Sequence, residues 1–369
     1  MKTVWLAYVK TFKDIVSNTS IFTTLILSVI FYSFFYPTAY EAQQAEALPI
    51  IIVDEEQSAL TATIIQHVSQ SPNVDIKTVT GNFSEAKALI ESQQADGILL
   101  LPSNLSQSIR HGENGGIGLY LSAANFLVTK QIGLGLVASI ENTLSNYAER
   151  FSQISTFSPA ISIHQIPLFN TLSGYGSYVF PAVAPLIIHQ TILLGLSMLL
   201  ALYMEQQHRI TFQRLVGICL AIFTIGCLGC FYLFGFTFWW YDYPRGGNFI
   251  GMLMAVPISM FCIIGLTTLL ASFLDLPERA GHVIVFTSIP LFMLSGVAWP
   301  HAAMPIWMQS FANVLPSTQI IQMFIQLNQM GVPTSIVLPK LVYLFSFGAL
   351  CMAIGYWRLT KKSKAQVVL

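Results

Sequence analysis

The residue types that most often do chemistry are sparse in this sequence and form no catalytic or metal-binding pattern. Cys227 and Cys230 have the C-x-x-C spacing of redox and zinc sites, but no second pair, nearby histidine or polar setting accompanies them. We interpret them as small helix-packing residues. Ser84 and Lys87 have the Ser-x-x-Lys spacing of a nucleophile and its base, but no companion motif follows, so a helix start is expected there. We predict no catalytic residue and no metal or cofactor bound by this chain.

The histidines divide into two groups by their surroundings. Three lie far apart in polar sequence and lack the spacing of metal ligands: His67, His111 and His164. His189 instead lies within an apolar run and is followed by Gln190. An ionisable side chain at membrane depth is either part of a transport pathway or a hydrogen-bonding partner between helices. Both interpretations stay open for His189 and Gln190.

The elements that must position these side chains are mostly membrane helices. The chain is 54% hydrophobic and 9% charged, whereas soluble domains carry about a quarter charged residues. Much of its surface must therefore face lipid. All five cysteines lie in apolar runs, so no disulfide framework is expected. The formal net charge is zero and no basic stripe lies away from the membrane flanks, which argues against nucleic-acid binding.

Six apolar segments are long enough to cross a bilayer as helices. They are residues 20–38, 180–203, 214–237, 250–273, 281–299 and 340–358. The first resembles a secretory signal, and Ala45-Glu46-Ala47 resembles its cleavage site. However, some twenty residues precede the apolar core, which is longer than the usual basic leader. We therefore expect an uncleaved anchor and a polytopic α-helical membrane protein with six transmembrane helices.

Orientation follows from the basic residues near the span ends. Ten fall on one side of the membrane if all six spans are real: Lys2, Lys10, Lys13, Arg209, Arg214, Arg279, Arg358, Lys361, Lys362 and Lys364. The other side has only Arg245 and Lys340 near the membrane. The positive-inside rule then places both termini, including a basic tail at 359–369, in the cytoplasm, and residues 39–179 outside.

Residues 39–179 form an inserted extracytoplasmic α/β domain with a formal charge of −7. Short apolar runs predict strands at 49–53, 74–79, 97–101 and 117–122. Helical patterns separate or follow them at 58–70, 84–92, 103–110 and 125–150. Strands that alternate with helices indicate a small α/β domain with a mixed sheet.

The N-terminal segment 1–19 has the pattern of an amphipathic helix. Four apolar residues recur at spacings of three, four and three, which places them on one helical face: Trp5, Tyr8, Phe12 and Ile15. The lysines lie mostly off that face. Such a helix lies in the membrane interface; the alternative is an ordinary helix packed on protein.

The loop 204–214 is short, polar and expected to be helical, with Glu205 and Arg209 placed as a favourable i, i+4 pair. It is either a docking surface for a cytoplasmic partner or only a connection.

On the opposite side, residues 300–339 are almost uncharged and broken by prolines, including Pro300, Pro305 and Pro316. Helical runs at 306–315 and 317–330 suggest segments half-sunk in the outer leaflet, whose irregular backbone must be covered by protein or line a cavity.

These features resemble the permease subunits of ABC-2 type transporters, specifically bacterial exporters with a large periplasmic domain between the first two transmembrane helices. The motifs that carry the resemblance are Ile52-Val53-Asp54 with Ser58, Gly97–Pro102, Phe169-Asn170, Tyr178–Pro181, Ser295-Gly296, Pro300, Met304-Pro305 and Leu315-Pro316. The family often carries Glu-Arg-Glu and then Gly-Thr after the second span. Here the run is Glu205-Gln-Gln-His-Arg209, so only Glu205 of that pattern carries over to this chain.

The resemblance assigns roles to the membrane-flanking segments. Residues 1–19 would be a cytoplasmic interfacial helix. A coupling site for an ATPase would comprise Glu205, Arg209, Phe212 and Arg214. Re-entrant helices within 300–339 would form an outer gate with Trp299, Pro300, Pro305, Trp307 and Pro316. The chain has no G-x-x-x-x-G-K-[ST] motif, so ATP and magnesium would bind a separate ABC ATPase subunit.

The leading hypothesis is the permease subunit of an exporter in the bacterial inner membrane. It would move amphipathic small molecules, such as drugs or lipid-like compounds, out of the cytoplasm or inner leaflet. Its partners would be the ATPase, a second permease copy (identical or homologous), a periplasmic adaptor and the lipid bilayer. The alternative is a membrane sensor that binds ligand on its outer domain. That role needs a cytoplasmic output domain, and the expected tail has only about eleven residues.

Overall fold

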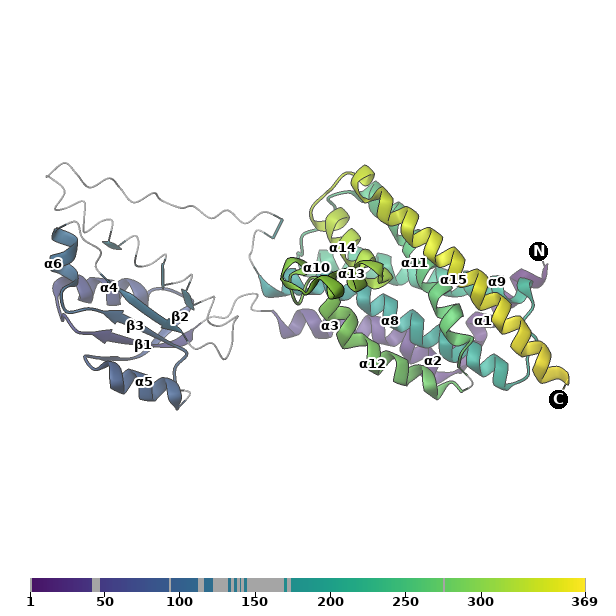
Figure 1. Cartoon of the computed structure of the whole chain (residues 1–369), viewed down its shortest axis with the longest axis horizontal. Coiled ribbons are helices and arrows are strands. Elements are labelled where there is room, and N and C mark those ends of the chain that lie inside the picture. The colour runs from purple at the N-terminus through teal and green to yellow at the C-terminus, as the bar shows by residue number, and fades with distance from the viewer. Residues whose placement is uncertain are drawn as a thin grey trace. The chain divides into compact units, whose positions relative to one another are not determined.

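The computed structural model divides into two compact units (Figure 1). The helical unit comprises Met1–Glu41 and Pro167–Leu369, and the α/β unit comprises Ala42–Ile166. The structure describes residues 2–41, 47–92, 94–111, 116–121, 132–133, 136–137, 140, 143–144, 169–170, 174–274 and 276–368.

The α/β unit is built on a four-stranded sheet in the order β2-β1-β3-β4. Its strands are β1 (Leu48–Asp54), β2 (Val74–Thr80), β3 (Gly97–Leu101) and β4 (Gly118–Leu121). β1 pairs in parallel with both β2 and β3, and β4 is antiparallel to β3. The described helices of the unit are α4 (Ala59–Ser69), α5 (Phe83–Glu91) and α6 (Leu105–Arg110). The predicted mixed sheet is therefore confirmed, while the predicted helix 125–150 lies largely outside the described residues.

The central strands of this sheet are apolar on both faces. Ile50 and Ile52 of β1 pack with Ile64 of α4 on one face, and Ile51 and Val53 pack on the α5 side. These four side chains of β1 are fully buried. A parallel strand covered on both faces needs such a continuous apolar run, which is why the strand could be recognised from sequence.

The helical unit contains five helices that are long and apolar enough to cross a membrane. They are Thr19–Ala39, which combines α2 (Thr19–Phe22), η1 (Thr23–Leu27) and α3 (Ser28–Ala39); α8 (Tyr175–Glu205); Phe212–Trp240, which combines α9 (Phe212–Cys230), η2 (Phe231–Thr237) and α10 (Phe238–Trp240); α11 (Phe249–Ala271); and Thr334–Lys362 within α15 (Thr334–Val368). A further helix, α1 (Lys2–Ser17), precedes them.

The predicted span 281–299 corresponds to α12, a helix of 17 residues from Glu278 to Leu294. It begins earlier than expected, at Glu278, and it ends earlier because Gly296 adopts a φ of +85°, a left-handed conformation that commonly ends a helix. At about 1.5 Å per residue, 17 residues reach about 25 Å, less than the roughly 30 Å of a hydrocarbon core. Five spans therefore meet the length criterion among the described residues, and the sixth stays a prediction.

The described region 300–339 contains short helices in place of a simple loop. They are η3 (His301–Ala303), α13 (Ile306–Val314), α14 (Pro316–Phe324) and η4 (Ile325–Gln329). The two predicted helical runs are confirmed. α15 begins at Thr334, earlier than the predicted span 340–358, because Pro339 is accommodated inside the helix near its start.

Close helix contacts hold the unit together, and glycines permit the closest of them. A Cβ on Gly265 of α11 would collide with the carbonyl oxygen of Gly348 on α15, and one on Gly355 would lie 2.7 Å from the backbone nitrogen of Leu269. The small residues of the last span therefore pack against α11, as the sequence suggested. α8 packs against several of the other helices and is buried along most of its length.

Candidate functional site

The loop between α8 and α9 begins with a turn and is not helical, which corrects the sequence-based expectation. α8 ends at Glu205, Gln207 has a φ of +55°, and residues 208–211 carry no regular structure. Thr211 caps α9 by accepting a hydrogen bond from the backbone of Arg214. Glu205 and Arg209 thus lose their helical spacing, and no ion pair joins them in the described structure. Threonine is a favoured N-cap residue, so α9 begins directly after Thr211.

The loop nevertheless presents a continuous set of exposed side chains. These side chains, here named the loop surface, are Glu205, Gln206, Gln207, Arg209, Thr211, Phe212 and Gln213. Phe212 is 61% exposed and meets the ring of Tyr356 edge-on, with centroids 5.5 Å apart. An exposed aromatic side chain among polar residues of both charges is typical of a surface that contacts another protein.

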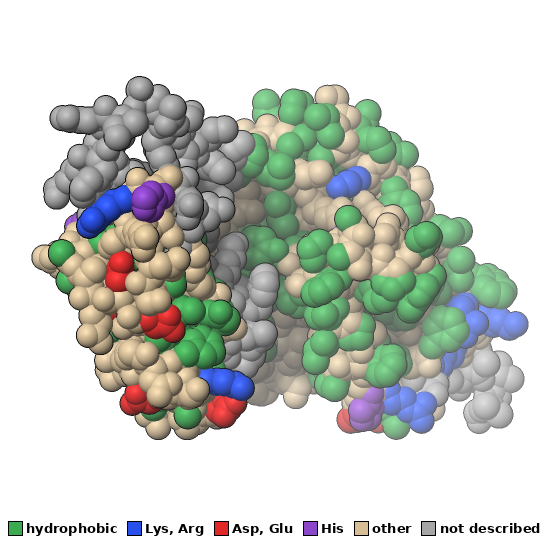
Figure 2. Space-filling model, turned by 60° about the vertical axis from the view of Figure 1, so that its left-hand side comes forward, with side chains coloured by type: hydrophobic (Ala, Val, Ile, Leu, Met, Phe, Trp, Pro, Cys, Tyr) green, Lys and Arg blue, Asp and Glu red, His purple; other side chains and the backbone are tan. Residues whose placement is uncertain are grey.

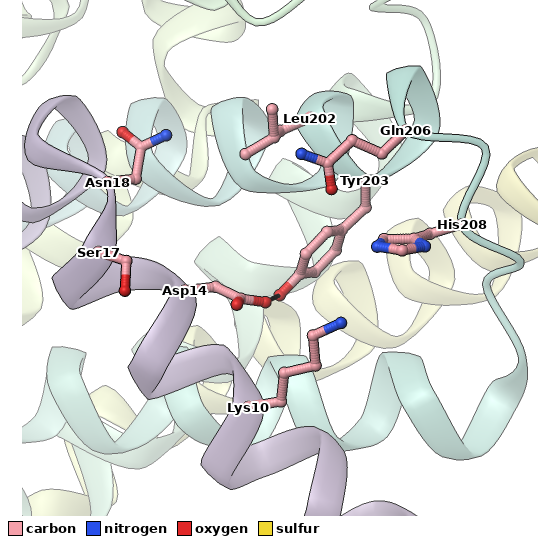
Figure 3. Close-up of a pocket in the computed structure, with 8 residues that line it drawn as sticks. All are labelled: Lys10, Asp14, Ser17, Asn18, Leu202, Tyr203, Gln206 and His208. Carbon is pink, nitrogen blue, oxygen red and sulfur yellow. Dashed lines mark hydrogen bonds between the residues drawn. The ribbon is translucent and has the colours of Figure 1, made fainter.

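A cavity of about 240 Å³ lies beside the loop surface, between α1 and the end of α8 (Figure 3). It is lined by Lys10, Asp14, Ser17, Asn18, Leu202, Tyr203, Gln206 and His208. Across it, the Tyr203 hydroxyl donates a hydrogen bond of 2.5 Å to Oδ2 of Asp14. The bond connects the N-terminal helix to the last turn of α8, and Figure 3 shows Lys10 extending from α1 toward the same space.

Tyr203 is also contacted from the other side of the loop. The Arg214 guanidinium lies 4.8 Å from its ring centroid, and the His208 ring meets it at 5.9 Å. Burial, followed by the positive charges of Arg214 and Lys10, lowers the pKa of His208 below its usual value. Arg214, predicted as a coupling residue, therefore lies against Tyr203 while Glu205, Arg209 and Phe212 face outward.

Sequence reasoning missed Asp14 and Tyr203. A signal was present, because Asp14 is the only acidic residue in the N-terminal helix and Tyr203 ends an otherwise apolar span. Their contact joins positions 189 residues apart, so helix periodicity alone could not have paired them.

α1 packs on α9 and also keeps an exposed apolar side. A Cβ on Gly217 would lie 2.6 Å from the Ala7 Cβ, so the glycine allows α1 to approach closely. Ile15 is fully buried, Trp5 is 64% exposed, and Tyr8 stacks on Trp5 between them. The predicted apolar face is thus divided between protein contact at its C-terminal end and exposure at its N-terminal end. Phe12 lies edge-on to Tyr8, at 5.0 Å.

His189 and Gln190 lie in the middle of α8, the most buried of the long helices. His189 is 3% exposed, and neither of its ring nitrogens has a hydrogen-bond partner among the described residues. Within the same part of the chain, both polar atoms of the Gln190 amide also lack a partner, as does the hydroxyl of Ser197 two turns along the helix. The hydrogen bond between helices that sequence allowed is therefore not formed at His189.

The predicted outer gate residues cluster around the start of α13 and α14. Pro300 precedes η3, Pro305 precedes α13 and Pro316 is the first residue of α14, positions where a missing backbone N–H is harmless. Trp299 is 53% exposed and Trp307 is 70% exposed. Both indoles are thus free to face a membrane interface.

The remaining candidates have ordinary structural surroundings. Cys227 and Cys230 are unbonded cysteines within α9, and Nδ1 of His67 hydrogen-bonds the Thr143 hydroxyl at 2.6 Å. α5 begins at Phe83 with Asn82 as its cap, so the Ser-x-x-Lys run opens a helix. His164 lies outside the described residues. Among the described residues, no group of three or more His, Cys, Asp or Glu side chains could hold a metal ion.

The family model for ABC-2 family transporter proteins matches residues 19–357, almost the whole chain. The chain belongs to this family. The match includes the α/β unit, the loop surface and the short helices before α15. Among curated proteins, no significant sequence match was found. The chain is accordingly a multi-pass membrane component of an ABC transporter, and its family implies a partnering ATPase subunit.

Proposed function

We propose that this ABC-2 permease exports amphipathic small molecules and receives the work of ATP hydrolysis through the loop surface. The observation that carries the proposal is the position of that surface. Its exposed residues continue directly from Tyr203, which contacts α1, the loop and the start of α9 together. A partner that moves the loop would therefore move three elements of the helical unit.

The proposed topology has six crossings, with α12 as the fifth. Three of its apolar side chains are more than 70% exposed: Val285, Phe286 and Ile289. A helix with such a surface is stable in contact with lipid, and local thinning or flanking residues can accommodate its short length. The positive-inside rule then places both termini in the cytoplasm of a bacterial cell and the α/β unit in the periplasm.

Six crossings would provide half of a translocation unit, so a second permease copy, identical or homologous, would complete it. The unpartnered polar atoms of His189 and Gln190 would face the transported molecule or polar groups of that copy, since buried polar groups are otherwise costly. The segment from Trp299 to Pro316 would close the outer end of the pathway, and a periplasmic adaptor would contact the α/β unit.

The test of coupling is co-purification with the ATPase subunit and measurement of permease-stimulated ATP hydrolysis. Glu205→Lys and Arg209→Glu reverse exposed charges on the loop surface and should reduce both quantities. Glu278→Lys is the matched control, because Glu278 is also exposed and lies in the other predicted cytoplasmic loop. If the loop variants bind and stimulate the ATPase as well as the control does, the coupling assignment fails.

The topology has its own test. A single cysteine at exposed position Ser69 of the α/β unit should react with an impermeant maleimide in intact cells, whereas one at Gln207 should react only after the membrane is opened. The reverse pattern would overturn the orientation.

A further inference from the structure

Lys340 is a half-buried cation near the start of α15. Its ammonium donates hydrogen bonds to the side-chain oxygens of Gln326, at 2.9 Å, and Gln322, at 3.5 Å. No ion pair joins it to an acidic residue in the described part of the chain. Arg245, the other basic residue predicted near this side of the membrane, differs, because it pairs with Asp242 at 3.7 Å.

The amides around Lys340 are fixed by the segment predicted as the outer gate. Nε2 of Gln322 donates to the carbonyl oxygen of Ser295, at 3.3 Å, and lies 3.0 Å from Nε2 of His301. The oxygen of Gln322 is thereby left to face Lys340. We name Lys340, Gln322, Gln326 and His301 the Lys340 cluster. It joins α15, α14, η4 and η3, and the lysine gives it a positive charge that no acidic side chain of the described residues compensates.

The surface next to the cluster is apolar. Ile336 of α15, one turn before Lys340 on the same helix face, is 61% exposed, and Phe311 and Val314 of α13 are 55% and 60% exposed. The Tyr343 hydroxyl donates to the carbonyl oxygen of Val314, so the end of α13 is held against α15. Figure 2 shows how widely hydrophobic side chains cover the visible face of the helical unit. The ammonium is therefore a single charge beside a surface suited to hydrocarbon.

The depth of Lys340 suits a headgroup. It lies six residues after Thr334, which corresponds to about 9 Å along the helix from its start, and a lysine side chain can extend toward the interface from that depth. Two neutral amides satisfy part of its hydrogen-bonding capacity but none of its charge. A cation in apolar surroundings is stabilised by a counter-ion, and a phosphate or carboxylate beside hydrocarbon tails provides one.

We propose that the Lys340 cluster binds the anionic headgroup of an amphiphile whose hydrocarbon tail lies on the exposed faces of α13 and α15. The headgroup chemistry is a phosphate or carboxylate, and its source is either a bilayer phospholipid or an exported amphiphile. The inference relies on the proposed function only in placing this end of α15 at the outer membrane face.

The test measures lipid retained by the purified full-length chain in native mass spectrometry, after exchange into mixtures of phosphatidylglycerol and phosphatidylcholine with equal tails. The wild type should retain the anionic lipid preferentially. Lys340→Gln should lower that preference about tenfold, which corresponds to about 1.4 kcal/mol, and Lys340→Arg should keep it. Arg245→Gln, which removes a basic residue from the same predicted side, should leave it unchanged.

Two outcomes overturn the proposal: a wild type without anionic preference, or a Lys340→Gln variant that retains phosphatidylglycerol as the wild type does. The melting temperature of each variant is measured as well, so that a misfolded variant is recognised. If Lys340→Gln is misfolded, Lys340→Arg shows whether the positive charge alone keeps the preference for the anionic lipid. Dodecyl phosphate added from solution distinguishes the sources. Displacement of retained lipid by it at micromolar concentration indicates a site for exported amphiphiles, and lack of displacement indicates a bilayer lipid site. Neither measurement requires ATP or transport, so failure here is separate from failure of the export assignment.

Discussion

The hydrogen bond between Tyr203 and Asp14 is expected to hold α1 against the end of α8. Tyr203→Phe removes the hydroxyl without changing the ring that contacts Arg214 and His208. A hydrogen bond to a charged group contributes about 1.5–3 kcal/mol. Asp14 is only half-buried and keeps some contact with water, so we take the lower end, about 1.5 kcal/mol.

That loss should appear as faster local opening of α1. Because every 1.4 kcal/mol is a factor of about ten, amide hydrogen exchange in the second half of α1 should speed up about tenfold in the full-length protein. The matched control is Tyr8→Phe on the same helix, whose hydroxyl makes a longer, neutral contact of 3.3 Å with the Thr224 hydroxyl. Its loss should speed up exchange by no more than about threefold.

A double-mutant cycle then isolates the pair. In an Asp14→Ala background the partner is already gone, so Tyr203→Phe should add little to the exchange rate. The reasoning is refuted if Tyr203→Phe accelerates exchange no more than Tyr8→Phe does. It is also refuted if the effect of Tyr203→Phe is undiminished when Asp14 is alanine.

Three further predictions concern packing, pH and the α/β unit. Gly265→Ala should lower the free energy of unfolding by about 2–3 kcal/mol, because the added Cβ would overpack against Gly348, and the melting temperature in detergent should fall accordingly. Gly235→Ala is the control and should leave the melting temperature unchanged, because nothing lies within 4 Å of a Cβ at that position. His208 has a lowered pKa in the folded protein, so as pH falls below about 6.5 the unfolded chain binds more protons than the folded one. The free energy of unfolding should therefore decrease in that pH range. Melting curves recorded over a pH series should show a smaller decrease in His208→Gln than in the wild type. Asp54→Ala removes an acceptor of three hydrogen bonds in the loop after β1 and should accelerate hydrogen exchange of β1 and α4, at a cost of about 2 kcal/mol.

The parts of the fold that could be predicted depend on local pattern. The run from Pro49 to Val53 identifies a strand buried on both faces, and the long apolar runs identify membrane helices, because each signal is contained in one segment. The predictions for the C-terminal end of α12 and for the course of loop 206–211 were wrong. Each depends on a single backbone conformation, the positive φ of Gly296 or of Gln207, which composition does not encode.

The candidate site was only half predictable for the same reason. Glu205, Arg209 and Phe212 could be assigned to a surface because a short polar loop between two spans must be exposed. The contact of Arg214 with Tyr203 could not, because it depends on how the connection folds α9 back against the end of α8. The contact of Tyr203 with Asp14 could not either, because it requires α1 to pack closely on α9, where the missing side chain of Gly217 permits the approach.

The geometry of α8 suggests how movement of the loop surface would reach the other end of that helix. α8 has 31 residues and is about 46 Å long at its usual rise, and neighbouring helices surround most of it, so it should move as one rod over its C-terminal part. Pro181 and Pro185 lie in its N-terminal third, where each removes a backbone hydrogen bond and permits a bend. His189 lies one turn past Pro185. A displacement imposed at Glu205 should therefore be transmitted as far as the unpartnered ring of His189 and be taken up as a change of bend just beyond it.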